Sequence, residues 1–382
     1  MKILFVSESY WPNLDGGALF ERRLAQGLIK RGHHVAVWAP AKNLRGHQEQ
    51  DGDSLIYREP AVPLLDRPYY KVSLWPFGHA FRIIRRERPD LIHIHNPTQI
   101  GLAALIAARY YHVPVMATNH AMPQNFLSPS LPSWLYNALV GLFWRYIAWF
   151  HNRMDFVATP TPIALSYLKK YGLRRPSAAI TNGLDLDHYN PGPAPHNHPP
   201  FLLYVGRLDS EKNLQLLIQA VALLKPTTSL RLELIGGGNQ QNTLIQATNE
   251  LGLTDIITFR GRVSEEDKLA AYRQADVFVI TSPAELQSIV TMEAMACAKP
   301  VVAVDAGALP NLVRDGVNGY LVPPNDAELL AQRCRQLLNS ASLRQRFGKA
   351  SLETIRTHHA TDVTFDAYER TYRQVLKENR AR

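Results

Sequence analysis

The sequence predicts an α/β protein with two parallel-sheet domains. Short apolar strands alternate with helical stretches in the first half of the chain, and a second alternation begins after a proline-rich interruption at 191–200. A chain of 382 residues also exceeds the size at which one hydrophobic core usually stops growing. We therefore predict a first domain over 1–190, a linker over 191–200, a second domain over 201–360 and a C-terminal helix over 361–382 that can cross back to the first domain.

The first domain contains short β-branched and aromatic runs separated by helical segments. The predicted strands are 3–7, 35–39, 91–95, 115–118 and 156–159, and the clearest helices between them are 18–31 and 101–109. Such alternation is typical of a parallel sheet covered by helices. Ligands of these folds bind at the carboxyl ends of the strands.

The second domain repeats this pattern. Its predicted strands are 201–205, 231–235, 256–259, 277–280 and 300–304. Two such domains that face each other create a cleft, where we expect a ligand to bind. The last segment places Phe365, Tyr368, Tyr372 and Leu376 on one helical stripe, which predicts an amphipathic helix.

The composition excludes several classes of protein. Cys297 and Cys334 lie in apolar or helical contexts without metal-ligand spacing, so we expect reduced packing residues in a cytosolic protein and no zinc or disulfide framework. The first residues, 1–6, form a short apolar run that predicts a buried strand and no signal peptide. We find no stretch long enough to span a bilayer.

The net charge of +9 belongs mostly to the first half of the chain. Residues 1–190 contain 21 Lys and Arg against 13 Asp and Glu, a difference of +8, whereas residues 191–382 contain 21 against 20, a difference of +1. No nucleic-acid-binding motif accompanies this excess, so we expect no nucleic acid partner. An anionic membrane surface is the alternative partner.

Two glutamates, Glu285 and Glu293, flank the start of a predicted helix. The strand 277–280 is followed by a break at 281–284, and the composition becomes helical from Ser288 onward. A helix N-terminus attracts a diphosphate, and neighbouring carboxylates accept hydrogen bonds from sugar hydroxyls. The pattern indicates a nucleotide-sugar site. Its alternative is that Glu285 caps the helix and Glu293 is solvated.

Two cations follow the first strand of the second domain. Gly206 and Arg207 leave this strand, and Lys212 comes five positions after Arg207. Both cations at a strand's carboxyl end would neutralise a diphosphate leaving group, the role that a metal has elsewhere. The alternative is ordinary surface charge.

Other strand ends are less specific. Gly16 and Gly17 precede a helix, where their backbone N–H groups approach a phosphate closely. The glycines from Gly236 onward and the loop with Arg262 and Val263 offer backbone groups to a nucleotide, but both patterns also suit ordinary turns. His120 follows a strand of the first domain and is expected to face the cleft, although a lone histidine is more often structural.

Over essentially its whole length the chain resembles the retaining glycosyltransferases of family 4, also called glycosyl transferases group 1. This family includes glycogen and sucrose-type synthases, lipid mannosyltransferases and diacylglycerol glucosyltransferases. The similarity implies the GT-B fold, which has two Rossmann-like parallel-sheet domains facing a central cleft. The motifs that carry it are Asn182-Gly183-Leu184-Asp185, Gly206-Arg207 with Lys212, the pair Glu285 and Glu293, and Asp315-Gly316-Val317-Asn318-Gly319.

The resemblance also implies residue roles. Glu293 would hold the ribose hydroxyls, Arg207 and Lys212 the diphosphate, and His120 the sugar near the reacting carbon. Gly17 would meet the diphosphate from the first domain. The donor sugar and phosphate would contact the loop from Glu285 through Gln287, Ser288, Ile289 and Val290.

The chain departs from the family pattern in the donor pocket. Gln287 and Ser288 stand where Phe and Gly are frequent, and Gly237 replaces a frequent Asp, so the motif does not identify the transferred sugar. In such families the Asp-X-Asp metal motif is dispensable. We therefore regard the triplets 51–53 and 185–187 as coincidental and expect no essential metal or other cofactor.

The segment 131–151 has the composition of a bilayer interface. Leu135, Leu139, Leu142, Tyr146 and Phe150 share one helical stripe, with Trp134, Trp144, Trp149 and Arg145 beside it. Aromatic and basic residues at 69–71, 75–77 and 82–88 form a second patch, and the segment 126–129 adds to the first. The alternative is that these helices simply pack on the sheet.

The segment 118–125 looks like the corresponding part of glycolipid synthases that glucosylate diacylglycerol. The sequence thus predicts a hexosyltransferase that moves glucose from UDP-glucose to 1,2-diacylglycerol with retention, without a covalent intermediate. It would be cytoplasmic and peripherally bound to the inner face of the cell membrane. The alternatives are mannosyl transfer from GDP-mannose to phosphatidylinositol, transfer to a soluble sugar, and a non-enzymatic carbohydrate-binding protein.

Overall fold

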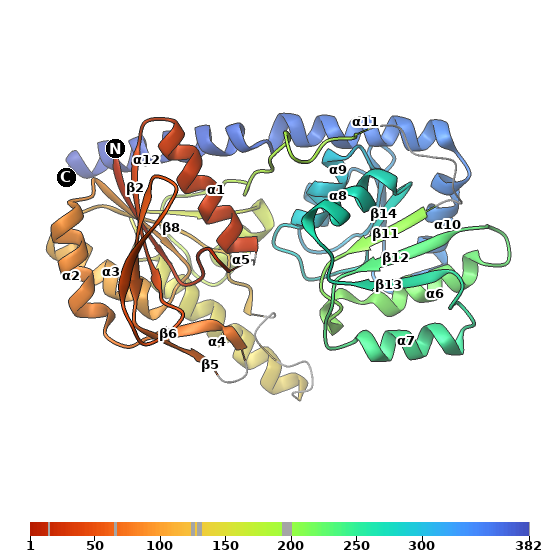
Figure 1. The fold of residues 1–382 in the computed structure, drawn as a ribbon, viewed down its shortest axis with the longest axis horizontal. Helices are drawn as coiled ribbons and strands as arrows, with labels where there is room; N and C mark the ends of the chain where they lie inside the picture. Colours follow the sequence, from red (N-terminus) through yellow and green to blue (C-terminus); the bar gives the residue numbers. More distant parts are fainter. Residues whose placement is uncertain (14–15, 65–66, 124–126, 128–131, 193–200, 382) are drawn as a thin grey trace. The chain divides into compact units, whose positions relative to one another are not determined.

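The computed structural model divides into two compact units. It describes residues 1–13, 16–64, 67–123, 127, 132–192 and 201–381 (Figure 1). The first unit contains Met1–Asn182 and Thr364–Arg382, and the second contains Gly183–Val363. The predicted domain boundary at 190 thus falls inside the second unit, and most of the predicted linker, 193–200, lies outside the described residues.

The described part of the first unit has an eight-stranded sheet in the order β10-β9-β8-β7-β1-β2-β4-β3. Neighbouring strands are parallel except for β3, which pairs antiparallel with β4. The five predicted strands are confirmed as β1, β2, β7, β8 and β9. The bounds are β1 (Lys2–Ser7), β2 (His34–Pro40), β3 (His47–Asp51), β4 (Ser54–Glu59), β7 (Leu91–His95), β8 (Val115–Thr118), β9 (Phe156–Thr159) and β10 (Ser177–Ala179).

Sequence analysis missed the strands of the segment 47–73. The strand β3 has the sequence His-Gln-Glu-Gln-Asp and lies at an edge of the sheet, so it needs no apolar run to form. A separate two-stranded sheet joins β5 (Ala61–Leu64) to β6 (Arg67–Ser73). The helices of this unit before the C-terminal segment are α1 (Gly16–Lys30), α2 (Pro76–Glu87), α3 (Gln99–Tyr110), α4 (Ser133–His151) and α5 (Pro162–Lys170).

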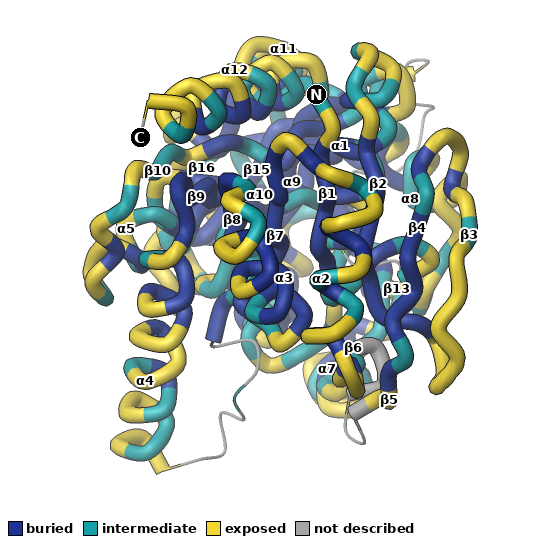
Figure 2. The backbone as a smooth tube through the Cα atoms, turned by 90° about the vertical axis from the view of Figure 1, so that its left-hand side faces the viewer, coloured by how far each residue is buried: buried dark blue, intermediate teal, exposed yellow. Residues whose placement is uncertain are grey.

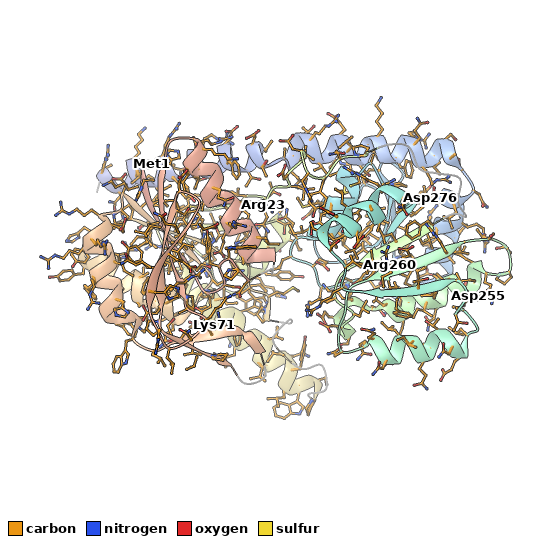
Figure 3. The ribbon with its side chains drawn as sticks, viewed as in Figure 1. Met1, Arg23, Lys71, Asp255, Arg260 and Asp276 are labelled. Carbon is orange, nitrogen blue, oxygen red and sulfur yellow. The ribbon has the colours of Figure 1, made fainter. Side chains whose placement is uncertain are left out.

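The second unit has a six-stranded parallel sheet, described in the order β13-β12-β11-β14-β15-β16. Asp276 directly precedes β14 (Figure 3). Its carboxylate accepts a hydrogen bond from the Phe201 N–H at 3.0 Å, which joins the starts of two adjacent strands. The bounds are β11 (Phe201–Val205), β12 (Arg231–Ile235), β13 (Ile257–Gly261), β14 (Val277–Ile280), β15 (Val301–Val304) and β16 (Gly319–Val322).

Helices and short 3-10 turns connect these strands. Cys297 and Cys334 are buried and unpaired by disulfides, as predicted, and burial raises the pKa of each thiol to about 12. The elements are η2 (Ser210–Lys212), α6 (Leu214–Leu224), α7 (Gln241–Glu250), α8 (Glu265–Gln274), α9 (Ile289–Ala296), η3 (Leu309–Asn311), α10 (Ala327–Leu338) and α11 (Ala341–His358).

The C-terminal helix α12 (Thr361–Arg380) starts in the second unit, but its residues from Thr364 onward belong to the first. The predicted apolar stripe is its packing face: Tyr368 and Tyr372 are fully buried in the core of the first unit. The Tyr372 hydroxyl lies 2.8 Å from Nδ1 of His93 on β7. The apolar stripe of α12, near the end of the chain, therefore packs in the same core as β1, near its start.

Helix α4 combines buried and exposed positions (Figure 2). Trp144 is 1% exposed and stacks on Tyr167 and Tyr171, so its expected place on an interfacial face is wrong. Phe150 is also buried, whereas Leu142 is 63% exposed. The packing alternative thus holds for one face of α4, and a different face remains open to solvent.

Candidate active site

The loops after the strands of the second unit pack closely at the carboxyl edge of its sheet. Gly206 and Gly236 have φ values of 153° and 133°, which favour glycine. A Cβ on Gly236 would lie 1.9 Å from the Gly206 carbonyl oxygen, so only glycine fits there. The Gly206 N–H also donates to the Ile235 carbonyl at 2.9 Å. The two glycines therefore bring the ends of β11 and β12 together.

Lys212 and Glu285 form an ion pair at this edge. Lys212 Nζ lies 2.8 Å from Glu285 Oε1, and the side chains are only 12% and 13% exposed. Thr281, directly after β14, donates its hydroxyl to the Lys212 carbonyl at 2.9 Å. The Ala308 N–H donates to the Glu285 carbonyl at 3.0 Å. Because these bonds fix both backbones, the pair is held in place before any ligand binds.

Glu285 does not cap the helix α9. The N-cap of α9 is Ser288, whose side chain makes no capping bond to a backbone N–H. Ser288 instead accepts a hydrogen bond from the Thr291 hydroxyl at 2.8 Å. The predicted donor-binding loop therefore leads into α9. Gln287 and Ser288 are buried, and Ile289 and Val290 are half-buried in the first turn of α9.

Arg207 is more open than Lys212. Its side chain is 55% exposed and pairs with Asp209 and Glu211, the second contact at 2.6 Å. Both cations thus follow β11 as predicted, but each has its own carboxylate partner. An anion that approaches Arg207 has to compete with two neighbouring carboxylates.

Glu293 is buried on α9, so the alternative of a solvated helix residue is wrong. The Tyr272 hydroxyl donates to its Oε2 at 2.8 Å, and the Tyr189 hydroxyl, which also contacts the Glu265 carboxylate, lies 2.8 Å from its Oε1. Lys268 Nζ lies 3.2 Å from Oε1. Tyr272 and Lys268 therefore hold this carboxylate, Tyr189 shares its one proton between Glu293 and Glu265, and about one acceptor position remains on Oε2 for a ligand hydroxyl.

Sequence analysis missed these three partners of Glu293. Tyr189 precedes the second sheet, and Lys268 and Tyr272 lie on α8, so the contacts span 104, 25 and 21 residues. The spacing of Lys268 and Tyr272, four positions apart on α8, places both on one helix face. This spacing could have predicted that Lys268 and Tyr272 lie together, but it does not identify Glu293 as their partner.

The loop after β13 contributes less. Arg262 is exposed, and Val263 is half-buried against the core of the second unit. Arg262 Nε would lie 3.9 Å from a Cβ on Gly237, so this guanidinium lies beside the glycine loop. The predicted residues Gly206, Gly236, Arg262 and Val263 thus occupy adjacent loops of one sheet edge, with β11, β12 and β13 as neighbours.

The remaining predicted residues belong to the first unit. Gly16 and Gly17 begin α1, and Phe20 on the same helix lies 5.2 Å from the His120 ring, measured between centroids. Loss of water around His120 lowers its pKa to about 4. At neutral pH the imidazole is therefore uncharged, and it can donate one hydrogen bond and accept another.

Comparisons with known proteins agree with this arrangement. The model for Glycosyltransferase Family 4 matches residues 14–188, and the model for Glycosyl transferases group 1 matches residues 190–354. This chain is a family 4 glycosyltransferase. It is an enzyme of the hexosyltransferase class with a GT-B fold.

Three proteins illustrate the similarity of this glycosyltransferase to its relatives. The alpha-monoglucosyldiacylglycerol synthase of Streptococcus pneumoniae is 25% identical, over 84% of this chain and 75% of its own. The phosphatidyl-myo-inositol mannosyltransferase of Mycobacterium leprae is 29% identical, over 88% and 87%. HepE of Anabaena, solved with UDP and with UDP-glucose, is 22% identical, covers 98% of this chain and 100% of its own, and has TM-scores of 0.77 and 0.75.

These relatives act on different substrates, so they identify the enzyme class and not the donor or acceptor. HepE shares the fold of this glycosyltransferase. Among the described residues, no helix combines the length and apolar character that a membrane crossing requires.

Proposed function

We propose that this glycosyltransferase moves glucose from UDP-glucose to 1,2-diacylglycerol, with retention at the anomeric carbon, at an anionic membrane surface. The observation that favours a lipid acceptor is the open face of α4. Its exposed side chains are Trp134 at 72%, Leu142 at 63%, Trp149 at 46%, Phe143 at 42% and Tyr146 at 40%.

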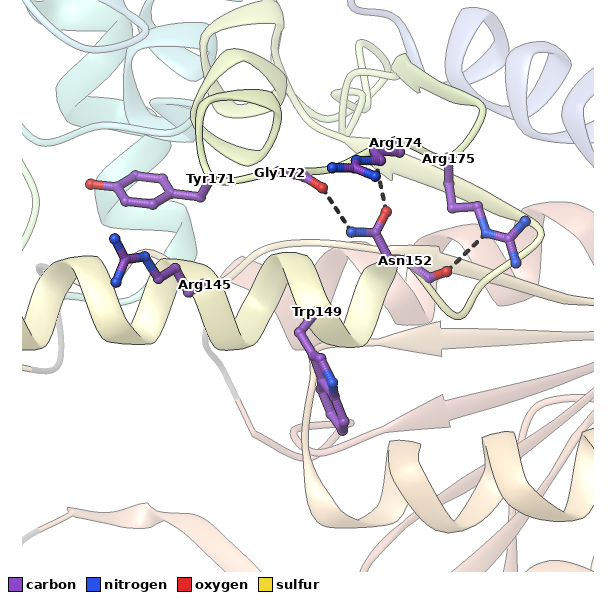
Figure 4. A pocket seen from close by; sticks show the side chains of 7 residues that line it. All are labelled: Arg145, Trp149, Asn152, Tyr171, Gly172, Arg174 and Arg175. Atoms are coloured by element: carbon purple, nitrogen blue, oxygen red, sulfur yellow. Dashed lines mark hydrogen bonds between the residues drawn. The ribbon is translucent and has the colours of Figure 1, made fainter.

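A basic surface adjoins these aromatic side chains. Arg145, Arg174 and Arg175 line a pocket of about 580 Å³ together with Trp149 and Tyr171 (Figure 4). Asn152 orders its floor: the Arg174 N–H donates to the Asn152 side chain at 2.8 Å, and Arg175 Nε donates to its carbonyl at 2.9 Å.

Two features of this surface suit a membrane. Helix α4 contains no Asp or Glu, and Arg153 lies over the Trp149 ring at 3.6 Å. Indole rings and guanidinium groups prefer the level of lipid head groups. The excess positive charge of the first half of the chain would also attract anionic lipid.

The ion pair of Lys212 and Glu285 supplies chemistry for the donor. When a diphosphate leaves, its charge is stabilised by preorganised cations, and Lys212 is such a cation at a sheet edge. Glu285, held 2.8 Å away, orients the ammonium group and offers its second oxygen to a sugar hydroxyl. His120, neutral at pH 7, is suited to donate a hydrogen bond to the sugar.

Retention without a covalent intermediate is part of this proposal. In such a reaction the acceptor oxygen attacks on the face that the diphosphate leaves, and a diphosphate oxygen takes its proton. A trapped glycosyl-enzyme adduct would contradict this mechanism. Glu285 is paired with Lys212, which makes it a poor nucleophile for such an adduct.

The test is a transfer assay with radiolabelled UDP-glucose and diacylglycerol in anionic mixed micelles, followed by counting of label in the organic extract. We expect label in the extract with the native enzyme and loss of that label with Glu285→Gln. A parallel assay with GDP-mannose and phosphatidylinositol tests the alternative favoured by the mycobacterial relative. Donor hydrolysis or binding without lipid labelling would overturn the lipid acceptor and favour a soluble sugar.

A further inference from the structure

Three potential metal ligands meet at the carboxyl edge of the first sheet. Glu21 lies on α1, His95 ends β7 and His120 follows β8. One ligand atom of each lies within 4.8 Å of the others. His95 Nδ1 is 3.8 Å from Glu21 Oε1, and the His95 and His120 rings stack with centroids 5.9 Å apart. Two imidazoles and a carboxylate are a frequent ligand set for zinc and similar ions.

His95 is buried without the bonds that its neighbour has. Its side chain is fully buried, and neither ring nitrogen has a hydrogen-bond partner in the part of the chain that the structure describes. The adjacent His93 bonds through both nitrogens, to Tyr372 and Thr118 at 2.8 and 2.7 Å. Because buried polar groups normally have partners, a histidine with neither ring nitrogen bonded needs a reason.

The other two ligands lie in similarly enclosed surroundings. Glu21 is 1% exposed, and His120 Nε2 is buried and lacks a hydrogen-bond partner among the described residues. His120 is partly exposed, whereas Glu21 and His95 are buried.

We propose that Glu21, His95 and His120 form a binding site for a divalent transition-metal ion, with Zn²⁺ and Co²⁺ as its best-suited occupants. Ligand atoms around tetrahedral zinc lie about 3.4 Å apart, given bonds of about 2.1 Å. The ligand atoms, which lie within 4.8 Å of one another, therefore have to approach one another by roughly 1 Å when an ion binds. The bound ion inhibits the enzyme, because it coordinates the His120 imidazole. The proposed function, on which this inference rests, assigns that imidazole to the donor sugar.

The binding test uses the full-length protein without an affinity tag, freed of metal and titrated with Co²⁺. We expect one equivalent to give the visible absorption of a four- or five-coordinate site, and Zn²⁺ to displace it. Absence of stoichiometric binding by the native protein would overturn the proposal. This readout needs no substrate, so it does not depend on the proposed function.

The variant Glu21→Gln removes the charge of one ligand at the same side-chain size, and His95→Asn replaces one imidazole by a smaller side chain. Each is expected to weaken Co²⁺ binding at least about tenfold, the lower end of the losses seen even for supporting groups around a metal. The matched control is His79→Asn, because His79 lies 2.8 Å from Glu59 in the same unit, and the described residues add no third ligand to that pair. Binding that is unchanged in both ligand variants would contradict the site.

If these buried substitutions prevent folding, X-ray absorption of the zinc-loaded native protein decides the matter. We expect scattering from two imidazoles, and a shell without imidazole would overturn the assignment. The inhibition arm adds Zn²⁺ to the transfer assay. Zinc that binds to the native protein but does not slow transfer would overturn the inhibitory role and leave the transfer reaction itself established.

Discussion

Glu285 and Glu293 are held by different kinds of partner. Glu285 has one cation, Lys212, in a half-open loop, whereas Glu293 accepts from two tyrosines and a lysine inside the unit. Burial, and after it the charge of Glu293, raises the pKa of Tyr189 and Tyr272, so both hydroxyls stay protonated as donors. Glu285 is therefore placed to respond to a ligand, and Glu293 is placed to stay fixed.

The variant Glu285→Gln tests the first of these roles. The amide keeps the volume of the side chain but removes the charge that orients Lys212. We expect turnover to fall on the order of a hundredfold, the scale of losing one preorganised charge contact in a transition state. The measurement is kcat with saturating donor.

The control for this variant is Glu233→Gln. Glu233 pairs with Arg260 at 3.1 Å on neighbouring strands of the same sheet, and it is 14% exposed, much like Glu285. It makes a similar ion pair away from the predicted donor loop. Equal turnover in the two variants would show that the Glu285 pair is only structural.

At the scale of elements, α4 has two faces with different roles. One face packs on the first unit through Trp144, Ile147 and Phe150, and the other exposes large apolar side chains. An exposed apolar patch of this kind marks an interaction surface. The sequence contains enough apolar residues to cover both faces, so the composition alone does not separate them.

Helix α4 is predicted to contact anionic lipid. The variant Leu142→Ser, on the exposed face, is expected to weaken the affinity for phosphatidylglycerol vesicles, measured by flotation, by about tenfold or more, because each buried apolar side chain contributes about 1.5–3 kcal/mol. The matched control is Leu223→Ser on α6 of the second unit, since that leucine is also exposed, at 45%. Equal flotation of both variants would remove α4 from the membrane contact.

At the scale of the whole molecule, α12 belongs to two units at once. It begins within the second unit, and its stripe of Tyr368, Tyr372 and Val375 fills the core of the first. At Gly27 on α1, a Cβ would lie 2.3 Å from the Phe365 ring, so the missing side chain makes room for α12. The first unit is therefore incomplete without the last residues of the chain.

Removal of the Tyr372 ring is expected to destabilise the first unit. Tyr372→Ala leaves a cavity and removes the partner of His93, so we expect its free energy of unfolding to fall by about 3–5 kcal/mol. Hydrogen exchange resolved by peptide measures this loss unit by unit. Arg373→Ala, whose side chain is 67% exposed on the same helix, is the control. Equal loss of protection in both units would contradict a role confined to the first.

Much of the fold follows from local patterns. The buried strands are runs of β-branched and aromatic residues, and the α12 stripe has helical spacing, so both were predictable. The edge strand β3 was not, because it is polar and its pairing with β4 is decided by the sheet. Trp144 was placed on the wrong face for a similar reason: its stacking on Tyr167 depends on how α4 meets α5.

By itself, the sequence determined the two alternating α/β halves, the family and the residues at the strand ends, because these depend on short-range periodicity and on motifs in order. Only the tertiary structure decided the partners: Tyr189 and Tyr272 for Glu293, Lys212 for Glu285, and the meeting of Glu21 with His95 and His120. The physical reason is that hydrogen bonds and ion pairs depend on distances in space. Residues as far apart as 104 positions satisfy them only after the sheets have formed.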